Sequence, residues 1–116
     1  MTIAELKDLL DAEVLCGGEL LDREIHSACG SDMMSDVLAY VKDQAVLLTG
    51  LVNSQVIRTA EMMDMICVVF VRSKRPTFEM LTIAEDSGIA VLATKMRMYE
   101  ACGTLYANGL GANHTP

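Results

Sequence analysis

The sequence predicts an α/β fold of three layers, in which a mostly parallel sheet has helices on both faces. Between residues 31 and 107, short runs that are apolar at nearly every position alternate with segments of helical periodicity. A strand without polar positions needs cover on both faces, which is typical of parallel sheets. The chain of 116 residues is long enough for one domain and too short for an eight-stranded barrel.

The part of the chain before residue 31 is expected to add one helix and two extended pieces. Thr2 and Glu5 have the spacing of a capping box, and apolar residues follow them at helical intervals. Glycines at the end of the first extended piece allow a turn with positive φ. The expected elements are a helix over 2–11, a strand over 13–16, a glycine turn at 17–18 and a weakly alternating extended piece over 23–29.

From residue 31 onward, each apolar run is followed by a polar residue that can cap the next helix. The expected strands are 45–50, 66–71 and 89–93, and the expected helices are 33–42, 53 or 54 to 64, 77–87 and 96–107. The residues that mark the helix ends are Asp32, Asn53 or Ser54, Pro76 with Gly88, and Thr94.

The sequence has no internal repeat, linker or low-complexity stretch, so we expect a single domain over 1–110 and a flexible C-terminal tail over 111–116. Its first residues lack the basic flank and apolar run of a secretory signal. No uncharged apolar stretch reaches the ~18 residues of a membrane span. We therefore expect a cytoplasmic protein with no membrane partner. The four scattered cysteines favour free thiols over a zinc or redox site.

Charge and motif content exclude several classes of function. The net charge of −7 and the absence of tryptophan disfavour nucleic-acid binding. The sequence has no P-loop, no dinucleotide motif and no nucleophile–base pair, so we expect no catalytic residues, no cofactor and no enzyme. Asp32 and Asp36 share a predicted helix face, but without a histidine or a third acid they make a poor metal site. We expect no bound metal.

Ligands of open α/β sheets bind beyond the carboxyl ends of the strands. The 49–54 loop could hold an anion on its N–H groups, or its polar residues could simply cap a helix. Arg72, Lys74 and Arg75 could clamp a phosphate or carboxylate, or form a solvated loop. An arginine facing the Asn53 loop would favour the clamp. The candidate ligand-binding residues are Ser31, Asp32, Thr49, Asn53, Ser54, Arg72, Arg75 and Thr94.

Nine methionines are concentrated on the predicted helices or at their ends. Thioether side chains adapt to irregular surroundings, so these residues either fill the core or form a surface that contacts a partner. A copper site would need more regular methionine spacing and an export signal. We favour the contact surface for the methionines that the core does not absorb.

Six segments in series are informative together: 2–6, 14–18, 21–25, 29–37, the helix from Asn53, and 89–95. Over residues 1–110 these segments resemble the DRTGG domain family. The family's Asp-Arg pair is present as Asp22-Arg23, but Thr-Gly-Gly is absent. The resemblance implies a three-layer fold similar to the N-terminal domains of HPr kinase and of the dipeptide-adding Mur ligase. In related proteins such a domain is joined to phosphotransacetylases or lies between the CBS domains of pyrophosphatases. The resemblance therefore implies a dimerisation and regulatory module without established catalysis.

These observations favour a non-catalytic regulatory or interaction domain that self-associates as a homodimer, with a further protein partner left open. The alternative is a small-molecule sensor that binds a nucleotide or a phosphorylated metabolite at the C-terminal ends of the strands. Asp32, Asn53 and Arg72 converging in a closed pocket would instead favour an enzyme.

Overall fold

The computed structural model describes residues 1–40 and 44–111, and it contains a five-stranded sheet with the order β1-β5-β4-β3-β2. β2, β3, β4 and β5 run parallel to one another, whereas β1 is antiparallel to β5. The sheet is therefore mostly parallel, as predicted. Lys42, the expected end of the second helix, and residues 112–116 of the expected tail lie outside the described residues. The strands are β1 (Glu13–Cys16), β2 (Ser27–Gly30), β3 (Ala45–Thr49), β4 (Cys67–Phe70) and β5 (Ala90–Ala93).

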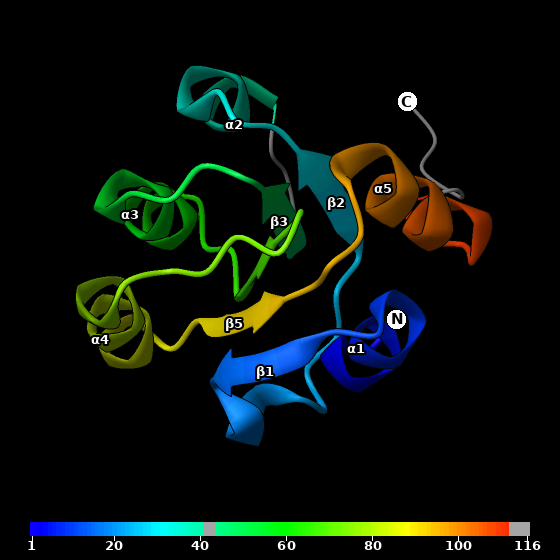
Figure 1. Cartoon of the computed structure of the whole chain (residues 1–116), viewed down its shortest axis with the longest axis horizontal. Helices are drawn as coiled ribbons and strands as arrows, with labels where there is room; N and C mark the ends of the chain where they lie inside the picture. Colours follow the sequence, from blue (N-terminus) through cyan, green and yellow to red (C-terminus); the bar gives the residue numbers. More distant parts are fainter. Residues whose placement is uncertain (41–43, 112–116) are drawn as a thin grey trace.

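Helices cover both faces of the sheet, which confirms the three-layer prediction (Figure 1). α1 and α5 pack on one face, and α2, α3 and α4 pack on the other. A short 3-10 turn, η1 (Gly18–Leu20), follows β1. No helix in the described part of the chain is long and apolar enough to cross a membrane. The helices are α1 (Ile3–Leu10), α2 (Met34–Tyr40), α3 (Ser54–Met62), α4 (Phe78–Ser87) and α5 (Met98–Ala107).

The three inner strands explain the apolar runs of the sequence. Every residue of β3, β4 and β5 is buried. Side chains alternate between the two cores: Leu48 faces the core under α1 and α5, whereas Leu47 faces the core under α2, α3 and α4. Because both faces are covered, neither alternate position needs to be polar.

The two outer strands are less regular than the inner ones. The weakly alternating piece expected over 23–29 contains β2, a parallel edge strand whose residues are alternately half-buried and exposed. β1 forms the opposite edge, where its register against β5 shifts between Val14 and Cys16. Such an irregularity bends an edge strand and interrupts its pairing.

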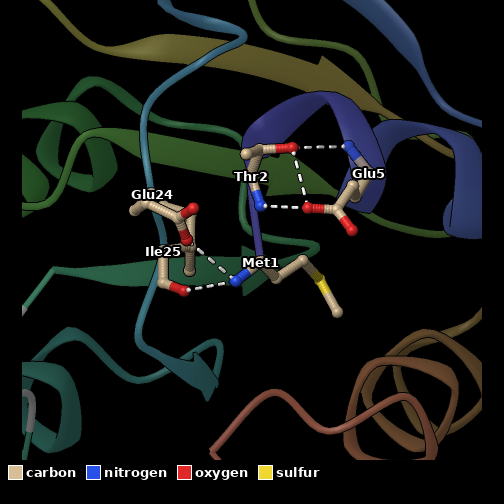
Figure 2. Close-up of polar contacts among 5 residues, drawn as sticks. All are labelled: Met1, Thr2, Glu5, Glu24 and Ile25. Atoms are coloured by element: carbon tan, nitrogen blue, oxygen red, sulfur yellow. Dashed lines mark hydrogen bonds and ion pairs between the residues drawn. The ribbon is translucent and has the colours of Figure 1, made fainter.

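The first helix begins with the predicted capping box (Figure 2). The Thr2 hydroxyl accepts the Glu5 N–H at 3.1 Å, and a Glu5 carboxylate oxygen accepts the Thr2 N–H at 2.9 Å. The Met1 amine lies 3.0 Å from the Glu24 carboxylate and 3.4 Å from the Ile25 carbonyl oxygen. These contacts fix the start of α1 against the segment that leads into β2.

Thr94 does not cap the last helix, contrary to the sequence prediction. α5 begins at Met98, two residues after the predicted start at 96, and its N-cap Arg97 makes no side-chain capping hydrogen bond. The buried Thr94 hydroxyl instead donates to the Leu10 carbonyl at 2.7 Å and accepts the Met96 N–H at 3.2 Å. Thr94 therefore joins the end of α1 to the loop after β5.

Candidate functional site

The candidate site lies at the carboxyl ends of β2, β3, β4 and β5, which meet at one edge of the sheet because the strands are parallel. Asp32 lies just beyond β2, and Thr49 is the last residue of β3. Arg72 follows β4 after one residue. These three predicted residues meet at the ends of neighbouring strands.

The Asp32 carboxylate connects the end of β2 to the end of β3. Its Oδ1 accepts the Gly50 N–H at 2.7 Å and the Thr49 hydroxyl at 3.0 Å. The prediction that Asp32 caps the second helix is therefore wrong, since within the described residues its hydrogen bonds go to the β3–α3 loop. The Ser31 hydroxyl accepts the Met33 N–H at 2.9 Å beside the start of α2.

Arg72 lies across this loop in an unusual backbone conformation. Arg72 and Ser73 both have φ of 59°, a left-handed conformation that costs a non-glycine residue about 1 kcal/mol or more. The N–H groups of Arg72 and Ser73 donate to Met96 and Thr94 carbonyls at 2.8 and 3.0 Å, so the loop after β5 holds the loop after β4. The Arg72 guanidinium packs against Gly50, where an added Cβ would overlap it.

The groups around Asp32 favour the ionised form of its carboxylate. Arg72 Nη2 lies 3.7 Å from Asp32 Oδ2. The Gly50 N–H contributes most to lowering the pKa of Asp32, and the Thr49 hydroxyl and the Arg72 charge add to it. Hydrogen bonds and a nearby cation stabilise the charged form more than the neutral form. Asp32 is therefore an anion at neutral pH.

The other predicted site residues have separate structural contacts. Arg75 pairs with both carboxylate oxygens of Glu13 on β1, at 3.1 and 3.3 Å. Asn53 caps α3 by accepting the Gln55 N–H at 2.8 Å, and the Ser54 hydroxyl lies 3.2 Å from Glu79. Of the two arginines, Arg72 is the one that faces the β3–α3 loop. Asp32 and Arg72 meet, whereas the Asn53 side chain accepts a hydrogen bond within its own helix cap.

A wide, open hollow of about 820 Å³ lies beside Arg72 and the start of α5. A second hollow of about 430 Å³ adjoins it at Ser73 and Lys95 and extends to Glu13 and Arg75. Four basic residues line the first hollow and Arg75 lines the second, so five of the nine basic residues lie at this end of the sheet. The lining residues of the first hollow are Arg72, Ser73, Lys74, Lys95, Arg97, Met98 and Tyr99.

The list of candidate residues left out Gly50, Lys95, Arg97 and Tyr99, although the 49–54 loop that it considered contains Gly50. The last three follow β5, and the pairing of β5 with β4 places their loop beside Arg72. Counting cations at each predicted strand end, rather than within one short segment, would have found Lys95 and Arg97.

Metal and thiol chemistry gain no support from the described residues. They contain no group of three or more histidine, cysteine, aspartate or glutamate side chains that could hold a metal ion. All four cysteines are free, as their spacing predicts. Burial raises the pKa of each thiol, most strongly at Cys67. Raised pKa values keep these groups as thiols, the less reactive form.

Comparisons with known proteins agree with this architecture. The structure is similar to a crystal structure of the CBS and DRTGG domains of the regulatory region of Clostridium perfringens pyrophosphatase, complexed with its activator, diadenosine tetraphosphate. The TM-score is 0.73 at 14% identity, over 90% of this chain and 45% of that one, which establishes similarity of fold. The sequence has no significant match among curated proteins. The family model of the DRTGG domain matches residues 5–106. The chain belongs to the DRTGG domain family.

Proposed function

We propose that this domain is a regulatory module that binds a phosphorylated ligand, of the nucleotide class, at the carboxyl end of its sheet. The observation that supports this proposal is the basic hollow. Its described lining residues include Arg72, Lys74, Lys95 and Arg97 and no acidic side chain, although the whole chain carries a net charge of −7. Clustered cations in an otherwise acidic protein raise the local concentration of anions.

The side chains of the hollow suit the two parts of a nucleotide. Arginines bind phosphate oxygens through paired donors, and lysines add compact positive charge. The Tyr99 side chain is 91% exposed at the rim, where its ring is free to stack on a base. The similar regulatory region from C. perfringens was crystallised with a nucleotide activator, which supports a ligand of this class.

Charge removal from the hollow tests the phosphate part of the proposal. The Lys95→Gln/Arg97→Gln double variant should bind ATP and inorganic tripolyphosphate at least tenfold more weakly than wild type, as measured by calorimetry. The Lys7→Gln/Arg58→Gln variant removes the same charge from α1 and α3 and should change affinity less than twofold. A ligand at 100 times its Kd adds about 2.7 kcal/mol to stability, so the absence of any thermal shift with either compound would refute the proposal.

Tyr99 tests the nucleotide part. Tyr99→Ala should weaken ATP binding severalfold and leave tripolyphosphate binding unchanged, because tripolyphosphate has no base to stack. Tyr106→Ala is the matched control, since Tyr106 is the other large exposed tyrosine of α5 and lies two turns further along it. Equal losses for ATP and tripolyphosphate would show that the ligand is recognised by its phosphates alone.

A second candidate function is self-association through the outer face of α5. Gly103 lies about one helical turn after Tyr99 and one turn before Tyr106 on this exposed face. Gly103 lies inside the helix, where glycine costs about 1 kcal/mol relative to alanine. Outside its own helix backbone, an added Cβ would nevertheless meet no atom of the described residues within 4 Å. Close approach of a second copy along α5 would account for the glycine.

Light scattering at micromolar concentration tests self-association. Wild type should have the mass of a dimer, and Gly103→Leu should have the mass of a monomer because the larger side chain separates the two helices. Gly18→Leu, in the turn after β1, is a control for the added side chain, since Gly18 also has open space around it. A wild-type monomer would exclude this candidate without affecting ligand binding to the hollow.

A further inference from the structure

The β3–α3 loop binds an anionic group of the protein itself, the Asp32 carboxylate. In a parallel sheet, a loop between a strand and the following helix is a common place for a ligand phosphate. Here the Gly50 N–H and the Thr49 hydroxyl, the donors that a phosphate would use, both donate to Asp32 Oδ1. The remaining oxygen, Oδ2, faces Arg72.

Arg72 lies between this internal anion and the basic hollow. It is an ion-pair partner of Asp32, and it also lines the hollow. Its guanidinium is held against Gly50, and its backbone is fixed by hydrogen bonds to the loop after β5. A guanidinium has five N–H donors, so one that pairs with a carboxylate on one side keeps donors for a second anion.

We propose that Asp32 is a specificity-determining residue, which fills the anion position of the β3–α3 loop and confines a phosphorylated ligand to the hollow beside α5. The location of the ligand in the hollow rests on the proposed function, whereas the filling of the loop does not. A phosphate entering the loop would have to displace two hydrogen bonds and overcome repulsion from the carboxylate.

Backbone amide spectra recorded during titration with inorganic phosphate at constant ionic strength test the proposal. In wild type the Gly50 amide signal should move only slightly, through the neighbouring Arg72 guanidinium. In Asp32→Ala it should move and saturate, because the Gly50 N–H and the Thr49 hydroxyl become available to phosphate. Asp32→Asn keeps an acceptor oxygen beside Gly50, so its Gly50 signal should remain fixed. Asp36→Ala removes the same charge from the exposed side of α2 and should behave as wild type.

Two results would overturn the proposal. One is a wild-type Gly50 signal that moves as far as it does in Asp32→Ala, which would mean that phosphate displaces Asp32. The other is a Gly50 signal that stays fixed in Asp32→Ala. If Asp32→Ala does not fold, Asp32→Ser replaces it. The serine variant also removes the carboxylate from the loop, so its Gly50 amide signal should move on addition of phosphate. A loss of structure alone would not create a saturable response to phosphate at Gly50.

The same titration separates this proposal from the proposed function. Binding in the hollow moves the amide signals of Ser73, Lys95 and Tyr99 in wild type. If these signals stay fixed while Gly50 responds in Asp32→Ala, the loop is filled by Asp32 as proposed and the hollow does not bind phosphate. If they move in wild type and Gly50 responds in no variant, the hollow binds phosphate and the role of Asp32 is refuted.

Discussion

Gly17 lies where the chain turns after β1 against the first residue of β5. Its φ is +81°, and an added Cβ would lie 2.6 Å from the Ala90 Cα. A side chain here is therefore opposed both by the left-handed backbone and by a backbone atom that cannot rotate away. The neighbouring Gly18 has no atom within 4 Å of an added Cβ.

This contrast gives a prediction for the stability of the two alanine variants. Gly17→Ala should lower the free energy of unfolding by about 2 kcal/mol or more, since conformational strain and steric overlap both contribute. Gly18→Ala should change it by less than about 0.5 kcal/mol. Urea denaturation of both variants measures the difference, and equal losses would contradict it.

Asp32 should make stability depend on pH in the acid range. The pKa of Asp32 lies below its ordinary value of 3.8, chiefly because of the Gly50 N–H. The unfolded state then binds the proton more tightly, so the contribution of Asp32 is full above about pH 5 and is lost as pH falls through 3.8 and below. Thermal unfolding from pH 7 to pH 2 should show the gap between wild type and Asp32→Asn narrowing as pH falls. A gap independent of pH would contradict this expectation.

At the scale of whole elements, the start of α3 shows which of two adjacent polar residues stabilises a helix. Asn53 accepts the Gln55 N–H, whereas the Ser54 hydroxyl lies beside Glu79 on the surface. Asn53→Ala should therefore cost about 1 kcal/mol, and Ser54→Ala should cost less than half of that. Chemical denaturation of both variants checks the assignment, and a larger loss for Ser54→Ala would reverse it.

The ends of helices and strands were predictable where burial determines them. They were less predictable where a contact with a distant loop determines them. The inner strands were predicted to within one residue at each end, because burial on both faces requires an apolar side chain at every position. The start of α5 was placed two residues early. Thr94 has the sequence features of a helix cap, but its hydroxyl donates a hydrogen bond to the Leu10 carbonyl, which lies more than 80 residues away in the chain. That partner cannot be identified from local sequence.

At the scale of the molecule, the edge of the sheet that holds the candidate site was predictable, but its composition was only partly so. The rule for strand ends placed Asp32, Thr49 and Arg72 among the eight candidate residues at this edge. Asp32 precedes a helix, where an aspartate commonly acts as an N-cap. Nothing in the sequence distinguishes that role from the hydrogen bond that Asp32 accepts from the Gly50 N–H. Nor does the sequence indicate positive φ at Arg72, since that residue is not a glycine.

The position of each strand in the sheet predicts an order of amide exchange. β4 is buried at every residue and pairs on both sides, whereas β2 is an edge strand with exposed Ala28 and Gly30. Hydrogen exchange should therefore be slower in β4 than in β2. Equal protection of both strands would contradict this and would indicate that another chain covers the β2 edge.

The antiparallel pairing of β1 with β5 has a consequence for how the protein is made. Glu13 lies opposite Ala93, and α1 packs beside α5, so the first and last parts of the chain build the same side of the molecule. During synthesis, the ribosome releases β1 long before its partner strand exists. The parallel unit from β2 to β4 is complete once residue 70 has emerged, whereas the N-terminal strand gains its partner only after the last strand leaves the exit tunnel.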